Sequence, residues 1–192
     1  HQGEFYGLLL FSILGMNLMV QARELLTAYM ALELLSFSLY IMVTYSLNNV
    51  KSNEAGIKYI IIGAFSSAVL LYGLSMVYGV LGVTRFHDIA MAISGSAELS
   101  PSLWVGVALI FVGLGFKLSI VPFHMWAPDT YEGAPLPVTA YLAIASKTAA
   151  FALVLRFLCE GLIPAGDLWH QWQIIFAIIA ALSMLTGNLV AL

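Results

Sequence analysis

The chain has 192 residues, of which 61% are hydrophobic and only 9% are charged. This balance lies far outside the composition of a soluble globular domain and predicts an integral membrane protein. The net charge of −3 is small and the basic residues form no run, so nucleic acid is excluded as a partner. The single cysteine, Cys159, cannot form an intrachain disulfide, and four scattered histidines show no spacing typical of a metal or haem site.

The first apolar segment, residues 5–20, has no basic stretch before it, so we interpret it as a membrane helix and not as a signal peptide. A second segment, residues 25–47, carries one acid, Glu33. Polar side chains at spacings of three and four residues place that acid on one helix face, with Tyr29, Ser36, Tyr40 and Thr44. Glu33 is therefore either a functional carboxylate or a neutral, hydrogen-bonded contact between helices.

A third segment is predicted to begin after a cap at Ser52 or Asn53 and to end near Gly82. Glu54 would then lie in the first turn, where the helix dipole favours an acid. Lys58 follows one turn later, close enough to the helix end for its ammonium to reach the interface, so its role stays open between anchoring and function.

Small residues in this third segment recur four positions apart and favour close helix packing, as Gly63 with Ser67 and Ser75 with Gly79. The longest polar stretch follows at residues 83–102, with a short interfacial helix expected at 89–93.

The fourth segment, residues 103–121, carries Lys117 just before Pro122. A lysine in hydrocarbon costs roughly 2.5–3.5 kcal/mol on insertion scales, so an intramembrane lysine indicates a functional site. A helix interrupted at membrane depth is tolerated only where its freed backbone groups are buried in protein or line a wet cavity. The lysine and the break together predict an ion path.

A second intramembrane lysine, Lys147, lies in the middle of the fifth segment, residues 137–158, among apolar neighbours. Burial favours the neutral amine unless water or an acid reaches it, so Lys147 is a candidate reversible proton carrier, with a structural lysine as the alternative. Between the lysines, Trp126 and Tyr131 are interpreted as aromatic residues at an interface.

The last apolar run starts near Gln173 and continues to the end of the chain, and the first residue is not Met, so we expect a piece of a longer protein. Orientation is not readable from charge, because the loops carry one basic residue each, Arg23 and Arg85 on one side and Lys51 on the other.

The string FKLSIVPFHMWAPDTYEGAP, followed by AIASKTAAF and preceded by YMALELLSFSLY and EAGIKY, closely resembles the antiporter-like membrane subunits of respiratory complex I. The resemblance covers nearly the whole chain, and a lysine at position 147 makes it greatest toward the N subunits, also called subunit 2. It implies an all-α membrane protein of about six transmembrane helices, one of them discontinuous. Residues 1–158 would form one five-helix antiporter-like repeat, and residues 159–192 a connecting loop and the truncated start of an inverted second repeat.

The resemblance also implies roles for four residues. Glu33 would pair with Lys117, Lys147 would pass protons onward, and Lys58 would be an accessory near the proton entrance. The corresponding charges of the second repeat lie beyond Leu192, so no complete transmembrane path is expected in this chain.

The implied function is proton translocation in an NADH:quinone oxidoreductase, driven by redox chemistry in other subunits. We expect no redox site and no cofactor in this chain; NADH, FMN, iron–sulfur clusters and quinone would bind partner subunits. The partners would be neighbouring antiporter-like membrane subunits, the lipid bilayer and, indirectly, a peripheral redox arm. We expect the bacterial inner membrane, with a thylakoid or other energy-transducing membrane as the alternative.

Two other functions stay open. The broken-helix string is shared with subunits of multi-subunit cation/proton antiporters and of membrane-bound hydrogenases. In the other alternative, the chain is a structural membrane anchor for peripheral subunits, and its charges serve only assembly.

Overall fold

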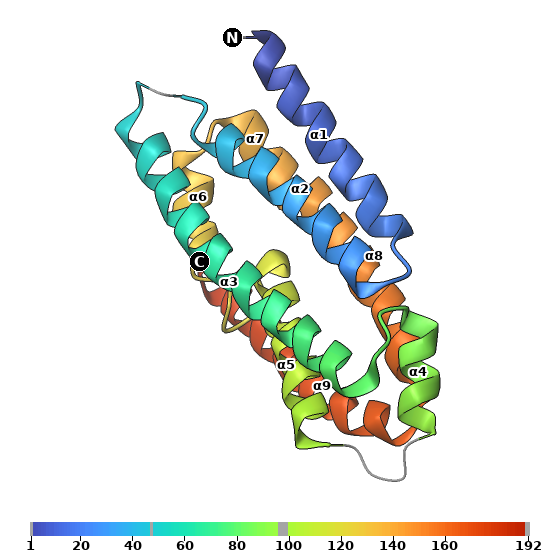
Figure 1. Cartoon of the computed structure of the whole chain (residues 1–192). Helices are drawn as coiled ribbons and strands as arrows, with labels where there is room; N and C mark the ends of the chain where they lie inside the picture. The colour runs from blue at the N-terminus through green and yellow to red at the C-terminus, as the bar shows by residue number, and fades with distance from the viewer. Residues whose placement is uncertain (1, 47, 96–99, 191–192) are drawn as a thin grey trace.

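The computed structural model describes residues 2–46, 48–95 and 100–190. In this part of the chain the regular structure is helical, apart from one isolated antiparallel bridge between Glu24 and Arg85. The elements shown in Figure 1 are, in chain order, α1 (Gln2–Gln21), α2 (Leu25–Val43), α3 (Val50–Leu81), α4 (Phe86–Ser94), α5 (Pro101–Leu118), α6 (Trp126–Gly133), α7 (Leu136–Tyr141), the π-helical turn η1 (Leu142–Ser146), α8 (Lys147–Phe157), the π-helical turn η2 (Leu158–Leu162), the 3₁₀ turn η3 (Ile163–Ala165) and α9 (Asp167–Val190).

Six segments of the described residues are long and apolar enough to cross a membrane: Gly3–Gln21, Leu25–Val43, Val50–Leu81, Pro101–Leu118, Leu136–Leu162 and Trp172–Val190. This confirms the predicted all-α membrane fold with about six spans. The discontinuous element is also present, because α5 ends at Leu118 and the chain resumes a helix only at Trp126.

The predicted boundaries of the second and third segments were wrong. Helix α2 ends at Val43, with Thr44 as its C-cap, and α3 already begins at Val50. The N-cap of α3 is Asn49, whose side chain accepts a hydrogen bond from the backbone N–H of Lys51 at 3.0 Å. Ser52 is instead fully buried and donates to the Val43 carbonyl at 2.7 Å, so it ties α3 to the end of α2.

Helices α3 and α5 cross closely because glycines face each other at the crossing. A Cβ on Gly73 would lie 2.8 Å from the Gly106 carbonyl oxygen, and one on Gly113 would lie 2.5 Å from Leu70 Cβ. The predicted small-residue pairs are used differently: Gly63 faces the Tyr40 ring of α2, and no atom lies within 4 Å of a Cβ built on Gly79. Glycine-mediated approach therefore fixes α3 against α5 and α2.

Helix α4 closes one end of the bundle (Figure 1). Its connection runs beside the start of α2, where Leu25 N donates to Thr84 O at 2.9 Å and Phe86 N donates to Arg23 O at 3.0 Å. The helix is longer than the predicted 89–93 and buries Phe86 and Ile89 almost completely.

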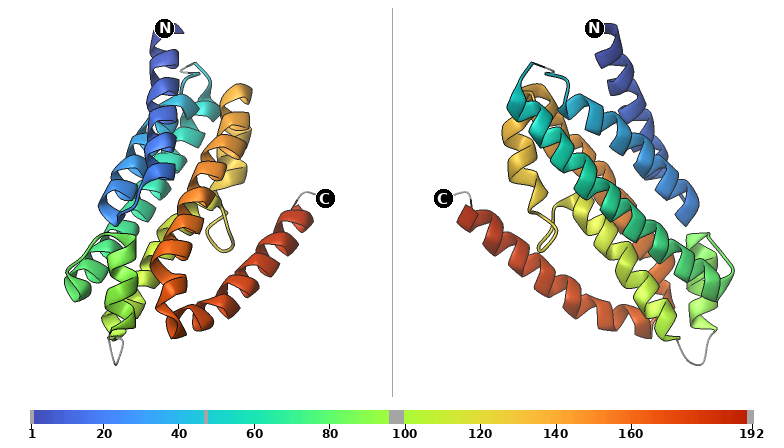
Figure 2. Two further views of the ribbon diagram at one scale, coloured as in Figure 1. Left: turned by 90° about the vertical axis from the view of Figure 1, so that its right-hand side faces the viewer. Right: turned by 60° about the vertical axis from the view of Figure 1, so that its left-hand side comes forward.

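Helix α9 leaves the bundle after its first turns and runs outward (Figure 2). Trp172 packs against Phe111 of α5, with ring centroids 5.2 Å apart, and the Ser183 hydroxyl accepts a hydrogen bond from Val121 N at 3.1 Å. Large apolar side chains along the rest of α9 are exposed, namely Ile174, Ile178, Leu182, Met184, Leu185 and Leu189. The apolar surface of α9 is therefore mostly left uncovered by this chain.

Candidate functional site

Glu33 lies half-buried on the polar face of α2. Ser67 of α3 donates a hydrogen bond to Glu33 Oε1 and lies 3.4 Å from the Tyr29 hydroxyl. The acid is therefore turned toward α3, where the Ser67 hydroxyl bonds it and connects it to Tyr29.

Lys117 lies in the last turn of α5 and approaches the same face of α2 one turn further along. Its Nζ donates to Ser36 Oγ at 2.5 Å, and the Ser36 hydroxyl donates to the Leu32 carbonyl at 2.5 Å. Ser36 is fully buried. Among the described residues no contact ion pair joins Glu33 to Lys117, although the two charges are close enough to interact electrostatically. The serine hydroxyl, and not the carboxylate, is the direct partner of the ammonium group.

Aromatic rings surround the Lys117 ammonium. Nζ lies 5.5 Å from the centroid of the Tyr40 ring and 5.9 Å from that of Tyr59. A cation over an aromatic face gains about 0.5–2 kcal/mol, more when desolvated, which offsets part of the cost of burying the lysine. The Tyr59 ring also stacks on Trp126, with centroids 4.8 Å apart, so the rings connect α2, α3 and α6.

The break after α5 begins at Ser119, which adopts a left-handed conformation with φ of 55°. Ser119 N donates to Phe116 O at 3.0 Å, and the indole N–H of Trp126 donates to the same carbonyl at 3.0 Å. Trp126 is 4% exposed, so its ring packs inside the protein, and its predicted position near a membrane interface stays a prediction. Its side chain returns to the helix that the break interrupts and satisfies a carbonyl freed there.

Lys147 is the first residue of α8, directly after the π-helical turn η1. Its Nζ lies 5.3 Å from the centroid of the Tyr131 ring, which belongs to α6. The side chain is half-buried, and Ala149 and Ala150 beside it are buried. Lys147 therefore faces the broken-helix segment.

Within the described residues, three buried hydroxyls of this segment lack a well-formed hydrogen bond, namely Ser119 Oγ, Thr130 Oγ1 and Tyr131 Oη, although Ser119 and Tyr131 lie near enough to interact with each other. Buried polar groups are normally paired, so these atoms indicate a place for ordered water. Sequence analysis missed Ser119 and assigned Tyr131 only to an interface. The position of Tyr131 in the string between the two lysines was the available signal.

Lys58 does not point toward Glu33 and Lys117. Its Nζ lies 2.9 Å from Asp129 Oδ2 of α6 and 2.9 Å from Glu54 Oε1 of α3, and its side chain is 45% exposed. The structure therefore brings Glu33 and Lys117 to the same face of α2, places Lys147 beside Tyr131 of α6, and leaves Lys58 at the edge of the group.

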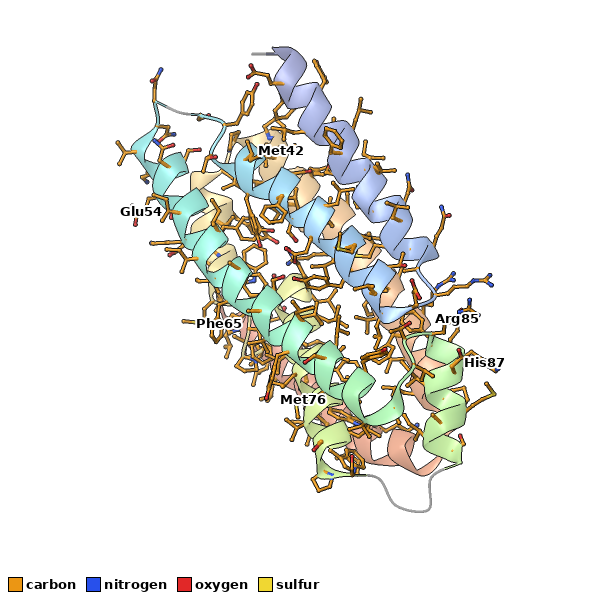
Figure 3. The ribbon with its side chains drawn as sticks, viewed as in Figure 1. Met42, Glu54, Phe65, Met76, Arg85 and His87 are labelled. Atoms are coloured by element: carbon orange, nitrogen blue, oxygen red, sulfur yellow. The ribbon has the colours of Figure 1, made fainter. Side chains whose placement is uncertain are left out.

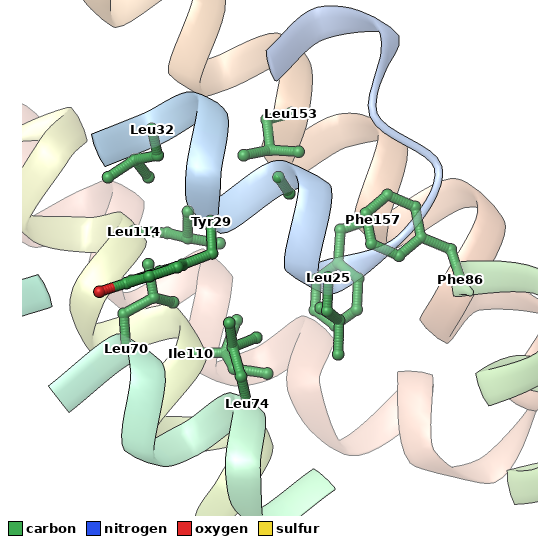
Figure 4. Close-up of a pocket in the computed structure, with 11 residues that line it drawn as sticks. Leu25, Tyr29, Leu32, Leu70, Leu74, Phe86, Ile110, Leu114, Leu153 and Phe157 are labelled. Carbon is green, nitrogen blue, oxygen red and sulfur yellow. The ribbon is translucent and has the colours of Figure 1, made fainter. Parts of the chain in front are cut away.

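An apolar pocket lies next to the polar group, between α2, α3, α5 and α8 (Figure 4). Its labelled lining residues are Leu25, Tyr29, Leu32, Leu70, Leu74, Phe86, Ile110, Leu114, Leu153 and Phe157. The only polar side-chain atom in this lining is the Tyr29 hydroxyl. A lining of this kind does not hold water well, so the polar contacts of the site lie outside this pocket, at Ser67 and Ser36.

Within the described part of the chain, no cluster of three His, Cys, Asp or Glu side chains is placed to hold a metal ion. The polar groups that the structure gathers are one acid, two ammonium groups and several hydroxyls. Such a set can bind and transfer protons.

Residues 22–192 match the transmembrane family described as NADH:quinone oxidoreductase/Mrp antiporter. The whole chain is 48% identical to the NADH-quinone oxidoreductase subunit N of Desulforamulus reducens, of which it covers 40%. Respiratory complex I from Thermus thermophilus contains a chain that is 37% identical, with a TM-score of 0.80 over 98% of this chain and 39% of that one.

A chain of the archaeal membrane-bound sulfane sulfur reductase is similar too, at 26% identity and a TM-score of 0.77, over 90% of this chain and 34% of that one. The chain thus spans about 40% of the length of the curated relatives it matches. The match over residues 22–192 shows that the chain belongs to the NADH:quinone oxidoreductase/Mrp antiporter family of transmembrane proteins.

Proposed function

We propose that this chain is the first antiporter-like half of a proton-translocating membrane subunit of an NADH:quinone oxidoreductase. The observation that carries the proposal is the placement of Lys117 within a membrane span, one α2 turn from Glu33 and hydrogen-bonded to Ser36. Charged groups at such a depth are retained for ion or proton movement.

In the proposed mechanism, Glu33 and Lys117 form the first proton-binding unit. A nearby carboxylate stabilises an ammonium, whereas burial favours the neutral amine, so a change in the charge or distance of Glu33 shifts the proton affinity of Lys117. Ser36 holds Nζ in place and can accept or donate as the protonation of Lys117 changes. The proton then passes to Lys147 across the region of Ser119 and Tyr131.

Residues 1–158 would be one five-helix repeat and residues 159–192 the opening of the second. The departure of α9 from the bundle supports this division, since its exposed apolar face needs further protein or lipid. The partners would be the remaining helices of the subunit and neighbouring antiporter-like subunits in a bacterial inner membrane. NADH, FMN, iron–sulfur clusters and quinone would be held by other subunits.

The test is substitution of Glu33 and Lys117 in the subunit that carries these residues, assembled in its membrane complex. Glu33→Ala and Lys117→Ala should each strongly lower proton pumping per NADH oxidised, while native gels show that the complex still assembles. Assembled complexes that pump normally with both alanines would support the structural-anchor alternative instead.

Cation/proton antiport is the remaining competitor, because the family includes Mrp antiporters. The chain is 48% identical to chains named NADH-quinone oxidoreductase subunit N but only 26% identical to the sulfane sulfur reductase chain, and this difference favours the oxidoreductase. Pumping in inverted vesicles that depends on NADH and is unaffected by Na⁺ or K⁺ gradients would separate the two functions.

A further inference from the structure

Two ion pairs join α6 to the beginning of α3. Lys51 Nζ lies 2.9 Å from Glu132 Oε1, and Lys58 Nζ lies 2.9 Å from Asp129 Oδ2. Glu54, on the outer face of α3 (Figure 3), also reaches Lys58 at 2.9 Å. We call the pairs Lys51–Glu132 and Lys58–Asp129 the ion-pair clamp.

Between the two pairs the helices are in close contact. A Cβ on Gly133 would lie 2.5 Å from Ala55 Cβ and 2.6 Å from the Lys51 carbonyl oxygen. Next to the second pair, Tyr59, which follows Lys58 in α3, stacks on Trp126, one turn before Asp129 in α6. Both helices thus contribute side chains at helical spacing to one antiparallel seam, with charges along its exposed edge and small or aromatic residues inside.

Helix α6 has eight residues, with the break on one side and Pro135 on the other. A helix of this length is marginal by itself, so its position depends on tertiary contacts. The side-chain bonds of its acids all go to α3, and no side-chain bond caps its N-terminus at Met125. The clamp is therefore well placed to set how α6 lies on α3.

The position of α6 matters because it contributes contacts to both lysine surroundings. Trp126 supports the Tyr59 ring, which lies 5.9 Å from Lys117 Nζ. Tyr131 presents its ring 5.3 Å from Lys147 Nζ. A shift of α6 would change the environment of Lys117 and Lys147 together.

We propose that Lys58 is a positioning residue that clamps α6 through Asp129 and thereby sets the environment of Lys117 and Lys147, and that it does not itself carry the proton. This inference rests on the proposed function, because its readout is proton pumping. The Lys58 ammonium group pairs with two carboxylates at the surface, those of Glu54 and Asp129. Its side chain does not reach Glu33.

The test compares arginine substitutions and a charge exchange in the assembled complex. Lys58→Arg should preserve pumping, because arginine keeps the charge pair, whereas a carrier must release its proton and arginine does not. Lys58→Asp should lower pumping by about threefold or more, since like charges then face each other across the seam. The double variant K58D/D129K should restore part of the loss, because the pair with α6 is re-formed with reversed polarity, whereas Glu54 then faces a like charge at position 58.

Two controls make the result specific. Charge reversal at the half-buried pair Arg156–Glu160, whose atoms are 3.7 Å apart, serves as the first control, and the variant Arg156→Glu should leave pumping unchanged. As the second control, the single variant Lys117→Arg in the otherwise unchanged complex should abolish most pumping. Loss of pumping in Lys58→Arg, or no rescue in the double variant, would overturn the clamp and assign Lys58 to proton transfer. Normal pumping in both single variants, Lys117→Arg and Glu33→Ala, would instead overturn the proposed function. Rescue in the double variant K58D/D129K would then still show that the ion-pair clamp positions α6.

Discussion

At the scale of single residues, hydroxyl groups mediate between the charges of the site. Ser67 donates to Glu33, and Ser36 accepts from Lys117, so both charges have neutral partners that can reorient when a proton moves. Glu33 and Lys117 can therefore act on each other electrostatically while each keeps its own hydrogen bond.

Lys117→Arg should fail to restore function, since a guanidinium stays protonated at any working pH. Pumping measured by quenching of a pH-sensitive dye in vesicles should fall by about tenfold or more, because a positioned proton carrier contributes roughly 10²–10⁴-fold. Near-normal pumping by this variant would show that a fixed charge is sufficient at this position.

Tyr131→Phe should lower pumping by about threefold or more, because it removes a buried hydroxyl that can hold a water and keeps the ring that covers Lys147. The matched control is Tyr72→Phe, because the Tyr72 side chain of α3 is 62% exposed and lies outside the site. Equal pumping by both variants would mean that only the Tyr131 ring matters.

At the scale of elements, glycine positions decide which helices meet. Gly113→Val would place its Cβ 2.5 Å from Leu70 Cβ on α3, and overpacking of this kind costs about 1–3 kcal/mol. We expect less assembled complex and a lower melting temperature in detergent. Gly79→Ala, where no atom lies within 4 Å of the added Cβ, should be neutral or slightly stabilising, and a large loss there would contradict the packing.

The Lys51–Glu132 contact should be insensitive to pH near neutrality. The hydrogen bond and charge of Lys51 lower the pKa of Glu132, although the neighbouring Asp129 opposes the shift. A carboxyl whose pKa is lowered in the folded protein contributes to stability fully above the ordinary glutamate pKa. This stabilisation is lost only as pH falls through the lower, folded pKa. Glu132→Gln should therefore not alter the shape of the pumping profile between about pH 6 and 8. A changed profile in this range would indicate that Glu132 itself titrates there.

At the scale of the whole molecule, the chain leaves much apolar surface uncovered. Exposed side chains run along α9, and α1 faces outward with Leu10 and Phe11 at 66% and 56% exposure. We expect residues 1–192, expressed alone and reconstituted, to show no specific proton flux under a pH gradient. The physical reason is that lysines without the remaining protein around them lose the closed surroundings that a charge in lipid requires. Flux that disappears in Lys147→Ala would show that this chain holds a complete path.

Much of the fold was predictable because membrane insertion depends on local properties. Runs of about 20 apolar residues, proline breaks and intramembrane charges are properties of contiguous sequence, and they predicted the spans and the discontinuous helix correctly. Spacing also placed Glu33 and Ser36 on one face of α2, because a helix repeats every 3.6 residues. Helix ends were less predictable, since the cap of α3 depends on which side chain accepts the Lys51 N–H.

The sequence by itself determined that this is a multi-span helical membrane protein with charges at bilayer depth and a broken helix between its two central lysines. Only the tertiary structure decided which groups meet: that Lys117 bonds Ser36, that Lys58 turns to Asp129, and that Trp126 is buried against Tyr59. These partners lie 81, 71 and 67 positions apart in the chain, so no local pattern encodes them. They follow from where glycines allow α3 to approach its neighbours and from how the break turns α6 back onto α3, because packing in three dimensions selects among helix faces that look alike in sequence.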